Sequence, residues 1–260
     1  MNIKAIYNRY IDPIVTIHEG ESYRNIMRYF LPEFVTALIL SSVLNCIDAY
    51  FISFLESTSK LATVTSTSML IQFIMKIAEG LSVGTVILGG NYNGQKAYTQ
   101  AGSVFSSAFW TTVIIGGGIS SLLVIGAWPI CYFFNIPADM CQMTVTFLRL
   151  RAVGVFFLFL FFAVIGFLRG IKNARAPMHF FVLGSGVFLL VDYLCIFGGC
   201  GIPAYGFYGS AIAFIVQYMV MFIAALLYIM FHPDLRKYGI RLMTERPLYK
   251  SWDIIQLSWP

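Results

Sequence analysis

Two aspartates stand inside long apolar runs of this chain. Asp48 lies in the stretch SSVLNCIDAYFISFL, residues 41–55, and Asp192 is the single charged residue between positions 176 and 233. A carboxylate at membrane depth costs roughly 2.5–3.5 kcal/mol on insertion scales, so it usually has a function or a partner. Burial disfavours the charged form of a carboxylate, and a second carboxylate nearby disfavours it further. Such a pair can hold a proton near neutral pH and release it when water, Na⁺ or a cationic ligand arrives.

Both acids are predicted to lie at a similar depth of the membrane. Asp48 lies 20 residues after Arg28, and Asp192 lies 17 residues after Arg175, and both arginines mark the same boundary. At a rise of about 1.5 Å per helical residue, the two carboxylates could face one shared cavity. A simpler interpretation stays open, in which each acid only hydrogen-bonds to a neighbour on its own helix, such as Asn45, or on an adjacent one.

Polar side chains recur at helical spacing near these acids. Residues at i, i+4 and i+7 share one face of a helix, and hard cations are bound by carboxylates together with neutral oxygens. A further stripe of Gln72, Lys76 and Glu79 could be an ion pair at i, i+3 or could line a cavity. The predicted ion or substrate contacts are Asn45, Ser41, Ser210, Gln217 and Gln72.

Composition defines the elements that must position these residues. The chain is 58% hydrophobic and 11% charged, and residues 97–138 carry no charge at all. A soluble domain cannot keep such stretches from water, which indicates an all-α polytopic membrane protein. Windows of about 20 apolar residues predict six helices, at Tyr29–Leu55, Leu61–Gly89, Gly102–Ala127, Met140–Leu168, Pro177–Gly198 and Gly206–Phe231.

Positive charge orients these helices. Most Lys and Arg side chains precede the first helix, separate the fourth from the fifth, or follow the sixth, all on one side. The positive-inside rule places that side in the cytoplasm. We therefore expect a multi-pass plasma-membrane protein with a cytoplasmic N-terminus and no binding to nucleic acid. The predicted organisation is a lead-in at 1–28, a six-helix lobe at 29–231, a basic cytoplasmic loop at 232–253 and the start of a seventh helix at 254–260.

Two groups of side chains in the later helices are expected at the lobe surface. Arg149 and Arg151 precede the apolar stretch 152–168, which ends at Arg169 on the cytoplasmic side. This spacing, about 30 Å of helix, predicts that both arginines snorkel to the outer interface. The many phenylalanines of the fourth to sixth helices are expected for the most part to face lipid.

Other chemistry finds little support. The five cysteines form no CxxC pair and the three histidines form no cluster, so no metal site and no cofactor are predicted. The signatures of a rhomboid-like protease and of a phosphatidyltransferase are both missing from the sequence. We therefore do not expect an enzyme.

Three stretches together resemble the multidrug and toxic compound extrusion (MATE) transporters. They are LPEFVTALILSSVLNCIDAYFISFL at 31–55, LRGIKNARAPM at 168–178 and YGFYGSAIAF at 205–214. The last ten residues, SWDIIQLSWP, also echo YRNIMRYFLP at the entry to the first helix, as in transporters built from two repeats. The chain departs from the family pattern at Phe188, where some members carry Asn.

The resemblance implies a fold of twelve spans in two lobes of six. It implies an antiporter that exports organic cations and other amphiphilic drugs by alternating access, in exchange for H⁺ or Na⁺. This chain would supply the N-terminal lobe, and a C-terminal lobe would be its partner. Asp48 and Asp192 would be the coupling acids.

Two alternatives stay open. The first is a lipid-linked oligosaccharide or polysaccharide flippase of the same superfamily, which would need a cavity richer in Arg and Lys for phosphate groups. The second is an inactive truncated half, which depends on whether the native reading frame continues past Pro260.

Overall fold

The computed structural model describes most of the lobe that the sequence predicts. The described residues are 27, 30, 31, 34, 38, 44–54, 57–173, 175–199, 201, 203–240 and 251–258. They form α4 (Leu44–Ser53), α5 (Thr58–Gly94), α6 (Tyr98–Ile125), α7 (Ala127–Phe133), α8 (Ala138–Gly170), α9 (Arg175–Phe197), α10 (Tyr208–Phe231), η3 (Pro233–Tyr238) and α11 (Ser251–Ser258). No strand occurs among these residues, so the all-α prediction is confirmed.

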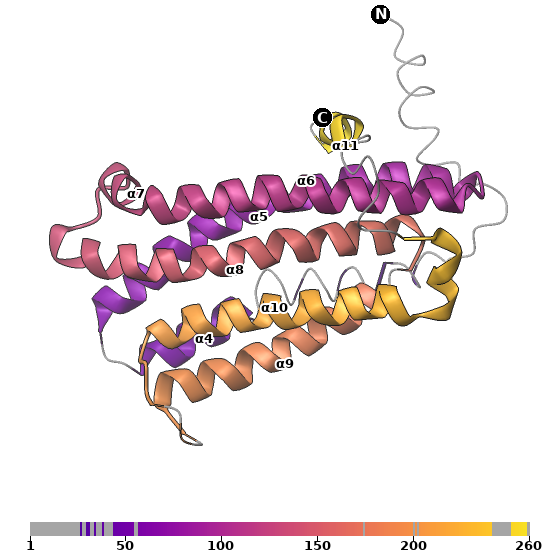
Figure 1. The fold of residues 1–260 in the computed structure, drawn as a ribbon. Helices are drawn as coiled ribbons and strands as arrows, with labels where there is room; N and C mark the ends of the chain where they lie inside the picture. Colours follow the sequence, from indigo (N-terminus) through magenta and orange to yellow (C-terminus); the bar gives the residue numbers. More distant parts are fainter. Residues whose placement is uncertain are drawn as a thin grey trace, which may run out of the picture.

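Five of the described helices are long and apolar enough to cross a membrane: α5, α6, α8, α9 and α10. They run alongside one another as an elongated bundle (Figure 1). Their bounds lie within about five residues of the predicted spans. Helices α5 and α8 extend beyond the apolar windows at both ends, whereas α10 begins two residues later than predicted and ends at the predicted Phe231. The first predicted helix is described as α4 only over its last part, and most of 29–43 lies outside the described residues.

The start of α5 shows how the local sequence determines where a helix begins. Ser57 precedes the helix with an extended backbone, and its hydroxyl accepts a hydrogen bond from the Lys60 backbone N–H at 3.4 Å. This is the usual role of a serine N-cap.

Helix α7, a separate short helix in the connection between α6 and α8, was not predicted from the sequence.

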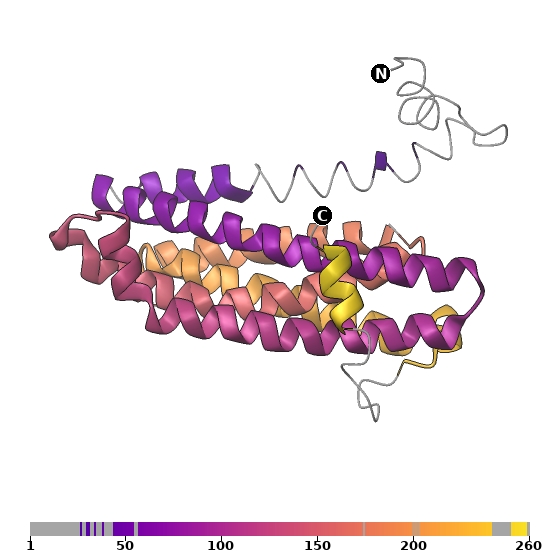
Figure 2. The same cartoon turned by 90° about the horizontal axis from the view of Figure 1, so that it is seen from above.

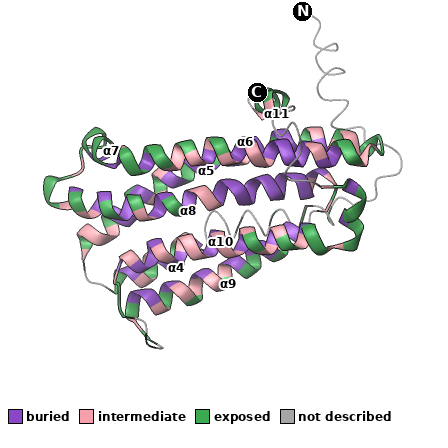
Figure 3. Cartoon of the chain, in the orientation of Figure 1, coloured by how far each residue is buried: buried purple, intermediate pink, exposed green. Residues whose placement is uncertain are grey.

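Helix α8 is the centre of the lobe. It packs against α5, α6 and α10, and buried side chains follow it for most of its C-terminal half (Figure 3). Small residues bring the neighbours close: a Cβ on Gly166 would lie 2.7 Å from the Ser82 carbonyl oxygen of α5. The helices therefore meet at backbone distance, as is common in membrane bundles.

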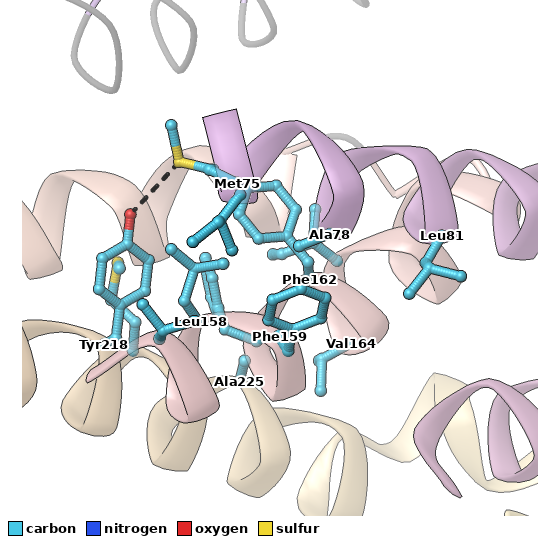
Figure 4. Packing of buried hydrophobic residues seen from close by; sticks show 14 of the residues in the cluster. Met75, Ala78, Leu81, Leu158, Phe159, Phe162, Val164, Tyr218 and Ala225 are labelled. Carbon is cyan, nitrogen blue, oxygen red and sulfur yellow. Dashed lines mark hydrogen bonds between the residues drawn. The ribbon is translucent and has the colours of Figure 1, made fainter. Parts of the chain in front are cut away.

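The phenylalanines of α8 correct one expectation. Phe159 and Phe162 lie in the core with Leu158, between Ala78 of α5 and Ala225 of α10 (Figure 4). The Tyr218 hydroxyl closes this cluster by donating to the Met75 sulfur at 3.8 Å. Most phenylalanines of the fourth to sixth predicted helices are buried within the lobe, and only a minority is exposed. They fill the space between helices because α8 is surrounded on several sides.

Helix α11 packs on the outside of α5 and α6. Seen from above, it crosses both helices (Figure 2). Ser251 accepts a hydrogen bond from the Thr111 hydroxyl of α6 at 2.7 Å, and Ile254 is buried. The helix begins at Ser251, three residues before the predicted start of the seventh span. Of the predicted basic loop, η3 forms the first part and 241–250 lies outside the described residues.

Candidate ion and substrate site

A small cavity lies among α4, α5, α8, α9 and α10. Its volume is about 50 Å³, which is room for a few water molecules or a small cation. Cavities that take drug-sized molecules are usually roughly 300–1,000 Å³. In this conformation the cavity therefore suits an ion and its water, and a larger ligand requires it to open. The polar side chains that line it are Asn45, Asp48, Ser68, Gln72, Arg151 and Gln217.

Arg151 is at the centre of the polar cluster. Its Nη2 donates to Asp48 Oδ2 at 3.3 Å and to the Ser210 hydroxyl at 3.2 Å, and its Nη1 donates to the Ser68 hydroxyl at 2.6 Å. Arg151 and Asp48 are each only 4% exposed. The prediction that Arg151 snorkels to the outer interface is therefore wrong. It points inward because a carboxylate and two hydroxyls replace the water that it would lose.

Arg149, two residues earlier, behaves as predicted for a surface side chain. It is exposed, and its Nε donates to the Val124 carbonyl oxygen at 3.1 Å. Residues at i and i+2 lie on nearly opposite sides of a helix, so the two arginines cannot share one environment. This spacing was the signal in the sequence that one of them must face inward.

Two aromatic rings also contact the guanidinium of Arg151. Phe147 of α8 and Phe214 of α10 lie 4.9 Å and 5.3 Å from it, measured to their ring centroids. Cation–π contacts of this length are attractive, more so when the cation is desolvated. Gly154 lies against the Phe214 ring, and any side chain there would collide with it. The local sequence thus holds α10 close enough to enclose the arginine.

Asp192 of α9 is buried differently from Asp48. Its exposure is 0%, and neither of its carboxylate oxygens has a hydrogen-bond partner among the described residues. It interacts electrostatically with both Asp48 and Arg151. Asp192 does not itself line the cavity, although Phe188, one turn earlier on α9, does. The simpler interpretation, a hydrogen bond from Asp192 to a neighbour, is not seen among the described residues.

The structure also places the remaining predicted contacts. Asn45, Gln72 and Gln217 line the cavity. Ser210 does not line it, but its hydroxyl accepts a hydrogen bond from Arg151. Ser41 lies outside the described residues. Lys76 and Glu79 form an ion pair with an N···O distance of 2.9 Å and do not line the cavity. Among the described residues, no group of His, Cys, Asp and Glu is arranged to hold a metal.

The buried charges do not balance. A guanidinium stays protonated in proteins, so Arg151 offsets one of the two carboxylates and leaves the other uncompensated. An unpaired buried ion costs several kcal/mol even after relaxation. A proton or a small cation at Asp192 would remove that cost, and this is the chemistry that the arrangement offers.

Comparison with known proteins gives a consistent result. The model of the MatE family matches residues 34–194. The probable multidrug resistance protein YoeA of Bacillus subtilis is 23% identical over 219 residues, which are 84% of this chain and 47% of that protein. The multidrug export protein MepA of Staphylococcus haemolyticus is 23% identical over 184 residues, 69% of this chain and 40% of that protein. This chain spans about half the length of the curated relatives it matches.

Solved structures share the fold. An outward-facing multidrug resistance MATE family transporter of the MOP superfamily superposes with a TM-score of 0.77 at 22% identity, covering 89% of this chain and 50% of that one. A MOP superfamily transporter from Pyrococcus furiosus, described as having a binding pocket of reverse polarity, gives 0.76 at 21% identity, covering 90% and 50%. The fold of this chain is thus shared with about half of each of these longer proteins.

Proposed function

This chain belongs to the MatE family of membrane transporters, and we propose that it is one lobe of a cation-coupled antiporter that exports organic cations and drugs. Transport would proceed by alternating access, in exchange for H⁺ or Na⁺. The second lobe would complete the path. We place the protein in the plasma membrane with its N-terminus in the cytoplasm, as the distribution of Lys and Arg favours.

One observation carries the proposal: Asp192, a fully buried carboxylate with no hydrogen-bond partner among the described residues, lies beside the Asp48–Arg151 ion pair. Intramembrane acids usually mark ion or proton pathways. The same site would bind the coupling ion in one half of the cycle and respond to the substrate in the other. Asn45, Gln72, Gln217 and Ser210, with Ser41, are the proposed neutral contacts around the acids.

The test is gradient-driven efflux in proteoliposomes. The full-length protein, expressed from its native reading frame, is reconstituted with ethidium as a fluorescent organic cation. Separate arms impose a pH gradient or a Na⁺ gradient. We expect Asp192→Asn to lower the gradient-driven rate at least about tenfold, because it removes the group proposed to bind the coupling ion. A tenfold change corresponds to about 1.4 kcal/mol in the barrier. Asp139→Asn, an exposed acid at the start of α8, is the matched control and should keep the wild-type rate.

If Asp192→Asn keeps the wild-type response to both gradients, the coupling role of Asp192 is wrong. If neither gradient drives efflux by the wild-type protein, cation-coupled export of this probe is wrong as a whole.

A second candidate is favoured by one specific observation, the arginine in the cavity. Lipid-linked oligosaccharides carry phosphates, and Arg pairs with phosphate through two parallel hydrogen bonds. However, Arg151 is already paired with Asp48, Lys76 is paired with Glu79, and Arg149 lies on the surface. One compensated guanidinium is a poor site for a pyrophosphate, so drug export is the better supported of the two. Faster flipping of a fluorescent polyprenyl-pyrophosphate sugar by wild-type vesicles than by protein-free vesicles would reverse this order.

A further inference from the structure

The charge count of the buried cluster limits how many coupling ions it can take. With both acids ionised, Asp48, Asp192 and Arg151 sum to one negative charge. No other Lys, Arg or His lines the cavity among the described residues. The cluster and the cavity therefore need one more positive charge, and not two, to become neutral.

The other titratable groups near the cluster do not alter this count. Tyr218 of α10 lines the cavity, but its hydroxyl donates to Met75 of α5. Cys195 lies about one turn after Asp192 on α9 and is buried. Both are neutral in their ordinary protonated forms. From α5, the neutral Ser68 and Gln72 line the cavity. Lys76 and Glu79 of the same helix do not line it, and their charges cancel in an ion pair.

Arg151 is held on Asp48 from several sides. Ser68 on α5 and Ser210 on α10 accept hydrogen bonds from the same guanidinium that binds Asp48 on α4. Removing one partner of a buried ion pair leaves an uncompensated buried charge, which is far more costly than losing a surface pair. A free ion at Asp48 would have to displace this side chain and break its contacts with three helices.

We propose that Arg151 acts as a built-in cation on Asp48, so that this lobe takes up one coupling ion, at Asp192, and not two. The inference rests on the proposed function, because it concerns the stoichiometry of that exchange. For a monovalent organic cation, exchange for one H⁺ or Na⁺ moves no net charge. Transport by the wild-type protein would then be insensitive to membrane potential. Without Arg151, both acids would need an ion, and the exchange would carry charge.

The experiment measures the ethidium gradient that the full-length protein sustains at zero net flux. Proteoliposomes receive a tenfold gradient of the coupling ion, with the membrane potential held at zero by valinomycin and equal K⁺. One ion per substrate sustains an ethidium ratio of about ten, and two ions about a hundred, because each tenfold ratio corresponds to about 1.4 kcal/mol. A second series sets a K⁺ diffusion potential without an ion gradient.

We expect a ratio near ten for the wild-type protein and no response to the diffusion potential. Arg151→Gln should raise the ratio toward a hundred and make transport respond to the potential. Arg151→Lys keeps a tethered cation and should restore the wild-type values. Arg149→Gln, on the same helix but exposed, is the matched control and should not change them.

A wild-type ratio near a hundred overturns the inference even if no variant can be purified. So does an Arg151→Gln variant that transports with a ratio near ten, because Arg151 would then be only a structural partner of Asp48. Both outcomes leave cation-coupled export intact. A wild-type protein that sustains no ethidium gradient overturns the proposed function, and the stoichiometry with it.

Discussion

Two of the ion pairs among the described residues differ in burial far more than in length. In Asp48–Arg151 the N···O distance is 3.3 Å and each side chain is 5% exposed, whereas in Lys76–Glu79 the distance is 2.9 Å and the side chains are 68% and 29% exposed. The shorter pair is the weaker one, because exposed charges keep their hydration and gain little from each other. The longer pair is desolvated, so removing either side chain takes away the direct partner of a buried charge and is strongly destabilising. Burial, and not distance, therefore determines how strongly each pair affects the stability of the fold.

The location of the exposed pair is also informative. Lys76 lies midway along α5, at the edge of a groove that α5 shares with α11. Charged side chains in the middle of a membrane helix almost always face protein or a water-filled path. We therefore propose that this face of α5 is turned toward water or toward another protein surface, while the buried pair lies inside the bundle.

The largest expected effect comes from breaking the buried pair on one side. Asp48→Asn removes the carboxylate that accepts a hydrogen bond from Arg151 and leaves only Asp192, which makes no such bond, as a counter-charge. We expect it to lower the free energy of unfolding by about 3–5 kcal/mol. Thermal unfolding of the purified full-length protein in detergent measures this as a clear fall in Tm. Asp139→Asn, an exposed acid, should leave Tm unchanged. If Asp48→Asn unfolds like the wild type, the pair is not a structural unit.

The next effect sharpens the same comparison. In the double variant Asp48→Asn, Arg151→Gln, neither member of the pair is left facing a lost partner, so the loss should be smaller than the sum of the two single losses. We expect an interaction energy of about 1–3 kcal/mol from the four-variant cycle, as for residues in one hydrogen-bonded network. An additive cycle would show that the two side chains do not act on each other.

More of the fold than of the candidate site could be predicted from the sequence. The spans follow from the apolar windows, because hydrophobic length is a local property. The Asp48–Arg151 contact joins residues 103 positions apart, and no local pattern specifies which helices meet there. The i, i+2 spacing from Arg149 could have shown that the two arginines face different surroundings, but both were predicted at the outer interface. The buried phenylalanines of α8 were missed for the same reason, since an apolar side chain suits lipid and a helix interface equally well.

A smaller effect concerns the hydroxyl that supports the buried pair. Ser68→Ala removes the 2.6 Å hydrogen bond to Arg151 Nη1, and we expect a loss of about 1–3 kcal/mol, the range for a hydrogen bond to a charged group. Ser66→Ala is the matched control, because its hydroxyl is exposed and donates to the Ala62 carbonyl within the same helix. Its effect should stay within about 0.5 kcal/mol. Equal losses in the two variants would mean that the arginine gains nothing from Ser68.

The smallest expected effect comes from removing the exposed pair altogether. In Lys76→Ala, Glu79→Ala, we expect the free energy of unfolding to change by less than about 1 kcal/mol, since hydrated ion pairs contribute little and the double change leaves no lone charge. The same variant should keep the ethidium ratio near that of the wild type, because neither side chain belongs to the buried cluster. A loss of several kcal/mol would contradict the comparison, and would place this face of α5 against a tightly packed partner surface in the full-length protein. A changed ethidium ratio with unchanged Tm would instead bring Lys76 and Glu79 into the ion path, and the charge balance would then have to include them.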